Sequence, residues 1–501
     1  MPNNKQKYRR TNRSKKKGKQ RATSGKQRAT SGKRSTSGKR TATTSKRTTG
    51  GRAIDAGSYG CVFDPALKCL TKNNTSHPPY DKNFISKLMY KEDAKAELDE
   101  MVKVKQYITK IPNADKYFLL SNTYVCNPDK LDNNDLANFN EKCGLFTKRS
   151  IMSENVNDNL NKLALLNMPN GGLSVEKTWT KILDDSNLIS QFIKINNSLI
   201  ELLKNGIVPL NKQGFHHYDV KSANILFGSD GYSRLIDWGL AGANDGKIVP
   251  EIIIDRSIAF NMPFSDIFFN NFVKSWLPEA IQQIKVSGDL FDKKAGQEEM
   301  LKIVAVNIIN KSIRSTSEGH FEYITGKILH DIYKIYASSN KYNRLDYNIL
   351  SYNVIVEYIV AVLKTFADEN GNFNDVKYYY DVFVHNVDIW GWIMTYSPII
   401  EESMGRMPTE VMNGLCRLFL KYCFSPEFAI KPIVLADLIA DFTSLNTIAG
   451  KAKNTPSLIP TNNAANILKP NNMKMMQKPH YPANIVKPNL STNIFSNNIS
   501  V

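Results

Sequence analysis

The chain has 501 residues, of which 42% are hydrophobic and 23% are charged. This composition excludes a wholly disordered or collagen-like chain, and the length allows about two to four domain-sized units with a sizeable core. The formal net charge is +19, but residues 1–54 hold nineteen Lys and Arg and no Asp or Glu. The remaining 47 basic residues balance 47 acidic ones, so the basic character belongs to the N-terminal segment.

The first 50 residues repeat a short basic unit. KQRATSG occurs at residues 19–25 and again at 26–32, and related units follow. Few of these residues could be buried, so we expect a disordered tail. Its Lys and Arg could contact the phosphate backbone of nucleic acid, its R-x-T/S units could be sites for a basophilic kinase, or it could be a solvated or localisation segment. The sequence leaves these alternatives open.

Residues 52–170 have the pattern of a small, mostly β part of the fold. Short β-like runs at residues 61–63, 84–89 and 163–166 alternate with one charged helix predicted at 91–104. From residue 186 to about 450 the apolar residues follow helical spacing, with loops predicted near 285–296, 315–320, 338–346 and 367–376. The sequence therefore predicts an α+β protein in which a β-rich part precedes a larger helical part.

The remaining features of the sequence are those expected of a soluble intracellular protein. The N-terminal segment lacks the apolar stretch of a secretory signal, and the apolar run at residues 354–363 is expected to be too short to span a bilayer. Residues 451–501 are rich in Asn, Pro and Lys and are expected to form a second disordered tail. The six cysteines show no C-x-x-C pair or metal-binding spacing, so we expect reduced structural thiols at Cys61, Cys69, Cys126, Cys143, Cys416 and Cys423.

The most informative motif is HHYDVKSANIL at residues 216–226, which LIDWG follows at residues 235–239. It places Lys221 two residues and Asn224 five residues after Asp219, and Asp237 thirteen residues after the asparagine. Phosphoryl transfer from ATP requires a carboxylate that orients the attacking hydroxyl, a cation beside the transferred phosphoryl, and oxygen ligands for Mg²⁺. These residue types, in this order, predict that chemistry.

This motif resembles the protein-kinase family, whose catalytic loop reads H-x-D-x-K-x-x-N and whose metal-binding turn reads D-F-G. The resemblance implies an ATP- and Mg²⁺-dependent kinase with Asp219 as the catalytic base, Lys221 beside the phosphoryl group, and Asn224 and Asp237 as metal ligands. It also implies a bilobal protein-kinase-like fold. Residues 51–170 would form a small β-rich N-lobe and residues 171–450 a large helical C-lobe.

Two kinds of substrate are compatible with this motif. Small-molecule kinases of the aminoglycoside or choline type also carry H-x-D and a later Asn. They usually lack a Lys at the position of Lys221, so the resemblance favours transfer to a Ser or Thr hydroxyl of a protein. A small-molecule kinase remains the alternative.

The sequence IDAGSYGCVF at residues 54–63 resembles the Gly-rich loop that covers the ATP phosphates. Glycines let backbone N–H groups approach the phosphates, and a Val at this place would cover the adenine. The resemblance assigns nucleotide binding to Ile54, Gly57, Ser58, Gly60 and Val62. Asp55 departs from the pattern, because it stands where the first glycine is expected.

Lys87, in the segment FISKL, is expected to bind the α- and β-phosphates. Its partner should be a helical glutamate, for which Glu97 is the first choice, but Glu100 and Glu92 remain possible. The segment LALLNMPNGG at residues 163–172 resembles the hinge between the lobes. There Asn167 and Met168 would offer backbone groups to adenine.

Asp55 and two further departures from the family pattern leave a kinase-shaped binding protein, tethered to nucleic acid by its basic tail, as a further alternative. Tyr218 replaces an Arg found in many kinases, and NMPFS at residues 261–265 stands in place of A-P-E.

Asp388 resembles the helical Asp that braces the catalytic loop, which would make residues 268–385, approximately, a helical insertion. These features together resemble the divergent Ser/Thr kinases of giant, mimivirus-like DNA viruses. A viral source would imply host cytoplasm or virion, and the basic tail would also allow the nucleus.

Overall fold

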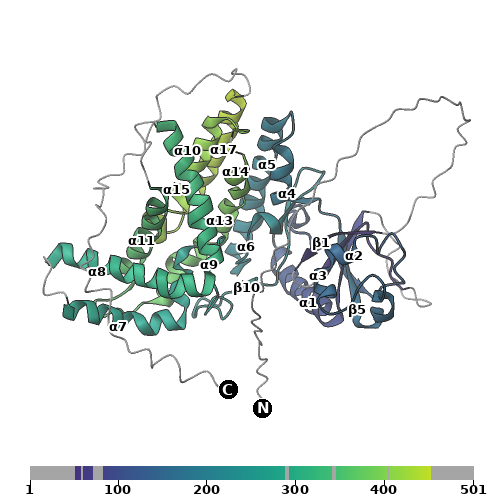
Figure 1. Ribbon diagram of the computed structural model, residues 1–501, viewed down its shortest axis with the longest axis horizontal. Coiled ribbons are helices and arrows are strands. Elements are labelled where there is room, and N and C mark those ends of the chain that lie inside the picture. The colour runs from purple at the N-terminus through teal and green to yellow at the C-terminus, as the bar shows by residue number, and fades with distance from the viewer. Residues whose placement is uncertain are drawn as a thin grey trace, which may run out of the picture. The chain divides into compact units, whose positions relative to one another are not determined.

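The computed structural model describes residues 51–57, 60–70, 83–287, 293–340, 346–403 and 405–452. Both expected disordered tails lie outside these residues, apart from 451 and 452, and so does Ser58. The described chain is mixed α/β. A small antiparallel sheet near the N-terminal end precedes a mostly helical remainder (Figure 1).

The sheet has five strands in the order β1-β2-β3-β5-β4, and all of its pairs are antiparallel. The strands are β1 Arg52–Gly57, β2 Gly60–Asp64, β3 Phe84–Tyr90, β4 Tyr124–Cys126 and β5 Leu163–Pro169. The three β-like runs predicted from the sequence lie in β2, β3 and β5, so these predictions are confirmed. β5 is buried up to Met168, because it lies between two strands and under a helix.

That helix is α1, Lys91–Ile108, which confirms the prediction of a helix at 91–104. Glu92 and Asp93 in its first turn are placed favourably for the helix dipole. Its buried side chains recur on one face and pack toward the sheet, at Ala94, Met101, Val104 and Ile108. Between α1 and β5 lie short elements, namely η1 Ala114–Lys116, α2 Phe139–Lys142, α3 Gly144–Thr147 and η2 Val156–Lys162.

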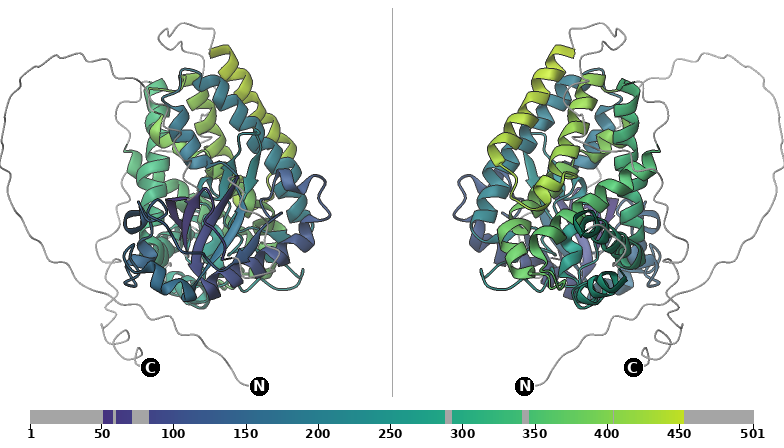
Figure 2. Two further views of the ribbon diagram at one scale, coloured as in Figure 1. Left: turned by 90° about the vertical axis from the view of Figure 1, so that its right-hand side faces the viewer. Right: turned by 90° about the vertical axis from the view of Figure 1, so that its left-hand side faces the viewer.

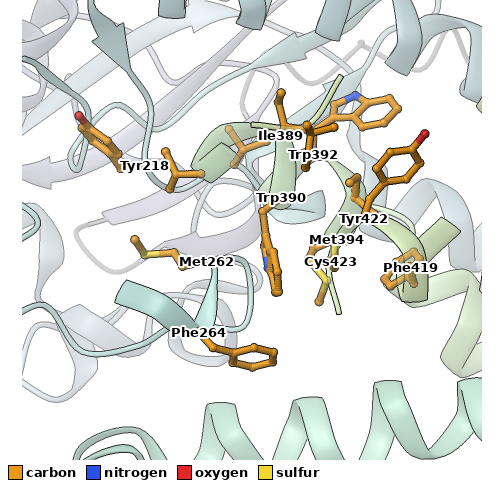
Figure 3. Packing of buried hydrophobic residues seen from close by; sticks show 14 of the residues in the cluster. Tyr218, Met262, Phe264, Ile389, Trp390, Trp392, Met394, Phe419, Tyr422 and Cys423 are labelled. Atoms are coloured by element: carbon orange, nitrogen blue, oxygen red, sulfur yellow. The ribbon is translucent and has the colours of Figure 1, made fainter. Parts of the chain in front are cut away.

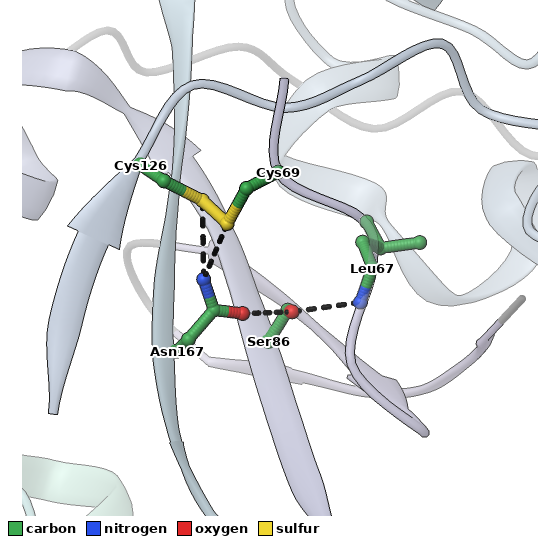
Figure 4. The surroundings of a disulfide bond; sticks show 5 residues. All are labelled: Leu67, Cys69, Ser86, Cys126 and Asn167. Carbon is green, nitrogen blue, oxygen red and sulfur yellow. Dashed lines mark hydrogen bonds between the residues drawn. A yellow bond between two sulfur atoms is a disulfide. The ribbon is translucent and has the colours of Figure 1, made fainter. Parts of the chain in front are cut away.

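Two disulfides cross-link this sheet region, so the expectation of reduced thiols is wrong for four of the six cysteines. Cys61 pairs with Cys143 across 82 residues and Cys69 pairs with Cys126 across 57 residues, whereas two buried cysteines, Cys416 and Cys423, are free. Such separations leave no local spacing to read in the sequence, because strand pairing brings the sulfurs together. In Figure 4, the amide of Asn167 points at the Cys69–Cys126 bridge and its oxygen accepts from Ser86.

The helical remainder also holds two small antiparallel sheets, one of β7 and β10 and one in the order β6-β8-β9. Their strands are β6 Leu173–Ser174, β7 Phe215–His216, β8 Ile225–Phe227, β9 Ser233–Leu235 and β10 Gly242–Ala243. Its α-helices are α4 Val175–Ile182, α5 Leu188–Leu202, α6 Val208–Lys212, α7 Asn271–Ser287, α8 Lys293–Ile308, α9 Arg314–Tyr323, α10 His330–Asn340, α11 Tyr347–Phe366, α12 Asp375–Tyr378, α13 Val384–Met394, α14 Ser397–Glu402, α15 Thr409–Tyr422, α16 Pro426–Ala429 and α17 Leu435–Ala452. Single turns of other helix types are η3 Leu203–Ile207, η4 Ser222–Asn224, η5 Phe264–Phe269, η6 Ile309–Ile313, η7 Ile324–Leu329 and η8 Tyr379–Phe383. The C-terminal helix α17 runs beside α5 (Figure 2), where the Asn196 amide donates to the Phe442 carbonyl.

One predicted loop is wrong and another prediction needs correction. Residues 315–320 belong to α9, where a non-helical backbone at Ser317 produces a kink but no loop.

The apolar run at 354–363, expected to be too short to span a bilayer, belongs to the 20-residue helix α11, which by length and composition alone could cross a bilayer. Among the described residues it is the single such helix, and 56% of its most apolar window is buried inside the fold. This burial is typical of a core helix in a soluble protein.

The core of the helical remainder is rich in aromatic side chains around α13. Trp390 contacts Phe264 of η5, with ring centroids 5.4 Å apart and nearly perpendicular planes (Figure 3). It makes a similar contact with Tyr358 of α11, with centroids 5.9 Å apart. Edge-to-face pairs of this kind add to the free energy gained from apolar burial. They fix α13 directly behind the loop that carries the predicted catalytic motif.

The disulfides generate a stability prediction. Reduction should lower the unfolding temperature of the wild type, because each bridge restricts a long loop of the unfolded chain and contributes about 2–4 kcal/mol. The measurement is thermal unfolding with and without a dithiol reductant. A variant in which Ser replaces Cys61, Cys69, Cys126 and Cys143 should unfold at a lower temperature that the reductant does not change. An equal response of wild type and variant to the reductant would contradict the prediction.

Candidate active site

A buried carboxylate from α13 holds the loop that follows β7. Asp388 Oδ2 accepts the His217 backbone N–H at 2.9 Å and Oδ1 accepts that of Tyr218 at 2.8 Å. Tyr218 has a φ of 56°, a left-handed conformation that is costly for a bulky residue. The two hydrogen bonds therefore stabilise a turn that this sequence would not adopt alone.

α13 approaches this loop as closely as its backbone allows. A Cβ atom at Gly391 would lie 2.4 Å from the Val220 carbonyl oxygen and 2.9 Å from Val220 Cβ. Only glycine fits at such a distance without a shift of the backbone. The helix and the loop are thus in direct contact, and the position of one determines the position of the other.

Asp219 is buried and receives hydrogen bonds from three side chains. Its Oδ2 accepts from Lys221 Nζ at 2.8 Å and from Asn224 Nδ2 at 2.9 Å, while Oδ1 accepts from Asn261 Nδ2 at 3.0 Å. Burial alone would raise the pKa of this carboxyl, but the Lys221 ammonium and the hydrogen bonds hold the pKa below its usual value. The group is therefore a carboxylate, able to accept a hydrogen bond from a hydroxyl.

The His217 ring connects this carboxylate segment to the residues around Asp237. Its Nδ1 accepts the Asp219 backbone N–H at 3.3 Å, and its Nε2 lies 3.0 Å from the Ile236 carbonyl oxygen. Burial lowers the pKa of this imidazole, so the ring is neutral and donates through Nε2. The ring also packs on Trp238, with centroids 4.9 Å apart.

Asn224 and Asp237 lie on the two segments that this contact joins. The Asn224 backbone carbonyl accepts from Ile236 N–H at 2.9 Å, and Asp237 has a φ of 67°, which turns the chain sharply after β9. The Asn224 amide nitrogen donates to Asp219, so its oxygen remains available to a cation. One amide oxygen and one carboxylate suit Mg²⁺, which keeps several of its waters and needs few protein ligands.

Lys87 of β3 makes an ion pair with Glu97 of α1. The distance from Nζ to Oε2 is 2.6 Å, and less than a fifth of either side chain is exposed. Of the three glutamates considered from the sequence, Glu97 thus makes the pair. Glu100 lies close by, and burial together with the charges of Glu97 and Asp237 raises the pKa of its carboxyl.

The sheet region and the helical remainder meet at this point. A Cβ at Gly239 would be 3.7 Å from both Glu100 Oε2 and Asp237 Oδ1, so carboxylates of α1 and of the segment after β9 approach the same place. Phe118 packs on Trp238 with centroids 5.7 Å apart. The structure therefore brings Lys87 and Glu97 to the same side of the molecule as Asp237.

The segment that resembles a Gly-rich loop forms the β1–β2 hairpin. A Cβ at Gly60 would lie 2.6 Å from the Leu88 carbonyl oxygen, which explains the glycine by close strand packing. Ile54 is exposed, Val62 is half-buried on β2, and Gly57 ends β1. Ser58 lies outside the described residues.

The charge of Asp55 is directed to α4. Its Oδ2 lies 2.5 Å from Lys177 Nζ, and about half of each side chain is exposed. An exposed pair contributes little to stability, but it offsets the negative charge that the sequence places in this hairpin. The residue that stands in place of the expected glycine, Asp55, therefore has a counter-ion in Lys177.

The two residues predicted for the hinge differ in their surroundings. The side chain of Asn167 is fully buried and engaged with Ser86 and the disulfide, and its backbone lies within the sheet, opposite Ser86 of β3 and Tyr124 of β4. Met168 is the last buried residue of β5, and the pairing of β5 with β4 ends one residue earlier, at Asn167. Gly172 follows with a φ of 96°, and a Cβ at this residue would lie 2.1 Å from the Phe227 carbonyl oxygen. Only glycine tolerates this position.

Sequence reasoning missed two residues at Asp219. The Asn261 amide donates to Asp219 Oδ1 and to the Val220 carbonyl oxygen. Arg256 Nη2 lies 3.9 Å from Asp219 Oδ1. Asn261 and Arg256 follow Asp219 by 42 and 37 residues, and no local spacing marks them.

No protein-family model matches the sequence, and no curated protein matches it.

The contact between α13 and the loop yields a prediction. Gly391→Ala should destabilise the protein by about 1–3 kcal/mol, because the added methyl overlaps Val220. The matched control is Gly450→Ala in α17, where a Cβ meets nothing within 4 Å, and it should be neutral or stabilising by up to about 1 kcal/mol. Thermal or denaturant unfolding of both variants tests this, and an equal response would refute the close contact.

Proposed function

We propose that this chain is an ATP- and Mg²⁺-dependent Ser/Thr protein kinase with a bilobal kinase-like fold. The observation that carries the proposal is the meeting of the Lys87–Glu97 pair with the Asp219, Asn224 and Asp237 segments. These groups come from parts of the chain that are far apart in sequence. The β-rich part and the helical remainder correspond to the N-lobe and C-lobe.

Asp219 has the properties that a base for a substrate hydroxyl requires. It is ionised, buried, and fixed by Lys221, Asn224 and Asn261. A fixed carboxylate orients the hydroxyl for in-line attack. It takes up the hydroxyl proton as the oxygen bonds to the γ-phosphorus and the bond from this phosphorus to the leaving ADP oxygen breaks. Lys221, which donates to Asp219 here, lies where it could also meet negative charge on the transferred group.

The nucleotide would be held from the other side. Lys87, oriented by Glu97, supplies a fixed positive charge for phosphate oxygens. Asn224 and Asp237 provide oxygen ligands for Mg²⁺, which when bound neutralises charge on the phosphates. The Asp55–Lys177 pair removes one objection to nucleotide binding at the hairpin, because the charge of Asp55 already has a partner.

Catalysis by Asp219 is tested by a transfer assay. Asp219→Asn should lower turnover about 10²- to 10⁴-fold while ATP–Mg²⁺ binding stays within about threefold, since the amide keeps the shape but cannot accept a proton. Basic proteins, aminoglycosides and choline-like alcohols are each offered as acceptors with labelled ATP. The label should appear on Ser or Thr of the proteins. The control is Asp368→Asn, at a fully exposed turn. Equal labelling by wild type and Asp219→Asn would refute the proposal.

The metal role of Asp237 gives a second test. Asp237→Asn keeps an oxygen ligand but removes a negative charge, so a higher Mg²⁺ concentration should be needed for half-maximal activity. A Mg²⁺ titration at saturating ATP measures this, again with Asp368→Asn for comparison. A titration curve that matches the wild type would exclude Asp237 as a metal ligand.

A further inference from the structure

Arg256 is a buried cation beside the proposed base. It lies in the loop between β10 and η5, and 11% of its side chain is exposed. Nη2 is 3.9 Å from Asp219 Oδ1, beyond hydrogen-bond distance, and Nη1 is buried without a hydrogen-bond partner in the described part of the chain. A guanidinium has five N–H donors, so one left unsatisfied in the interior requires an explanation.

Asp266 of η5 is the second unsatisfied group. It is 1% exposed, and neither of its carboxylate oxygens has a hydrogen-bond partner among the described residues. Burial raises the pKa of this carboxyl to about 7, and the charge of Arg256 opposes that rise. Among the described residues, Arg256 and the phenol of Tyr378 are the charged or titratable groups that interact electrostatically with it. Above neutral pH the site thus holds a buried carboxylate at a cost in stability.

The guanidinium is therefore attracted by two carboxylates, and no hydrogen bond joins it to either of them among the described residues. At 3.9 Å from Asp219 Oδ1, it stays beyond hydrogen-bond distance of Asp219. If Asp266 lost its charge, only Asp219 would attract Arg256. The guanidinium would then close on Oδ1, the oxygen that Asn261 shares and that a substrate hydroxyl would need.

We propose that Arg256 is a positioning residue for Asp219 and that Asp266 sets how closely its guanidinium approaches, an inference that rests on the proposed phosphoryl transfer. Arg256 supplies the positive charge that keeps the Asp219 segment in place. Tyr218 cannot do so, because its hydroxyl is paired with that of Tyr379. Asp266 holds the guanidinium back, which leaves Oδ1 open to the hydroxyl.

The test compares four variants at about pH 8, namely Arg256→Gln, Arg256→Lys, Asp266→Asn and the double variant Arg256→Gln/Asp266→Asn. Arg256→Gln and Asp266→Asn should each lower kcat about tenfold or more, with the KM for ATP within about twofold of wild type. Arg256→Lys should retain kcat within about threefold, because Arg256 makes no bidentate bond and its charge is what matters. The matched control is Arg406→Gln, which breaks an exposed pair with Asp184 and should leave kcat unchanged.

Stability is measured on the same variants by thermal unfolding. Arg256→Gln should lower the unfolding temperature, since it leaves Asp266 without its cation. Asp266→Asn should raise it at about pH 8 and raise it less at about pH 5, because a carboxyl whose pKa is raised in the folded state begins to destabilise the fold above its unfolded pKa and does so fully only above its folded pKa of about 7. The double variant should unfold at or above the wild-type temperature and still have a low kcat.

The outcomes separate the two proposals. Recovery of kcat together with stability in the double variant would show that Arg256 acts only through folding, and would overturn the inference. If the wild type transfers no phosphate to any acceptor, the proposed function fails, and the unfolding temperatures alone decide the rest. Shifts of the single variants that simply add in the double variant would then refute the coupling of Arg256 and Asp266, whereas non-additive shifts would support it.

Discussion

A buried negative charge at Asp219 is the constraint on which the rest of this site depends. A carboxylate removed from water is tolerated only when nearby donors and cations compensate for its lost hydration. Here Lys221, Asn224 and Asn261 provide hydrogen bonds, and Arg256 adds a charge at longer range. The loop conformation, the contact with α13 and the segment around Asn261 all follow from supplying those groups.

The two parts of the chain contribute to the site in different ways. The sheet region contributes an ion pair, Lys87–Glu97, on regular elements that two disulfides cross-link. The helical remainder contributes irregular backbone, with left-handed conformations at Tyr218 and Asp237. Strained backbone of this kind persists only where surrounding packing determines it, and the aromatic core around Trp390 provides that packing.

Local patterns in the sequence were sufficient for part of this description. The helix at 91–104, three strands and the polar motif at Asp219 follow from periodicity and spacing of a few residues. Contacts between distant residues were not accessible in this way. The disulfides join cysteines 57 and 82 residues apart, and Asn261 reaches Asp219 from 42 residues away. The loop expected at 315–320 is wrong because a run of polar residues with a glycine resembles a loop in sequence, whereas it belongs to α9 with a kink at Ser317.

The brace at Asp388 follows the loop that it holds by 171 residues. A polypeptide is made from its N-terminal end, so His217 and Tyr218 emerge from the ribosome long before α13 exists. Their amides lack this acceptor until Asp388 has been made. The loop at Asp219 can therefore take its final position only in a chain that already includes α13.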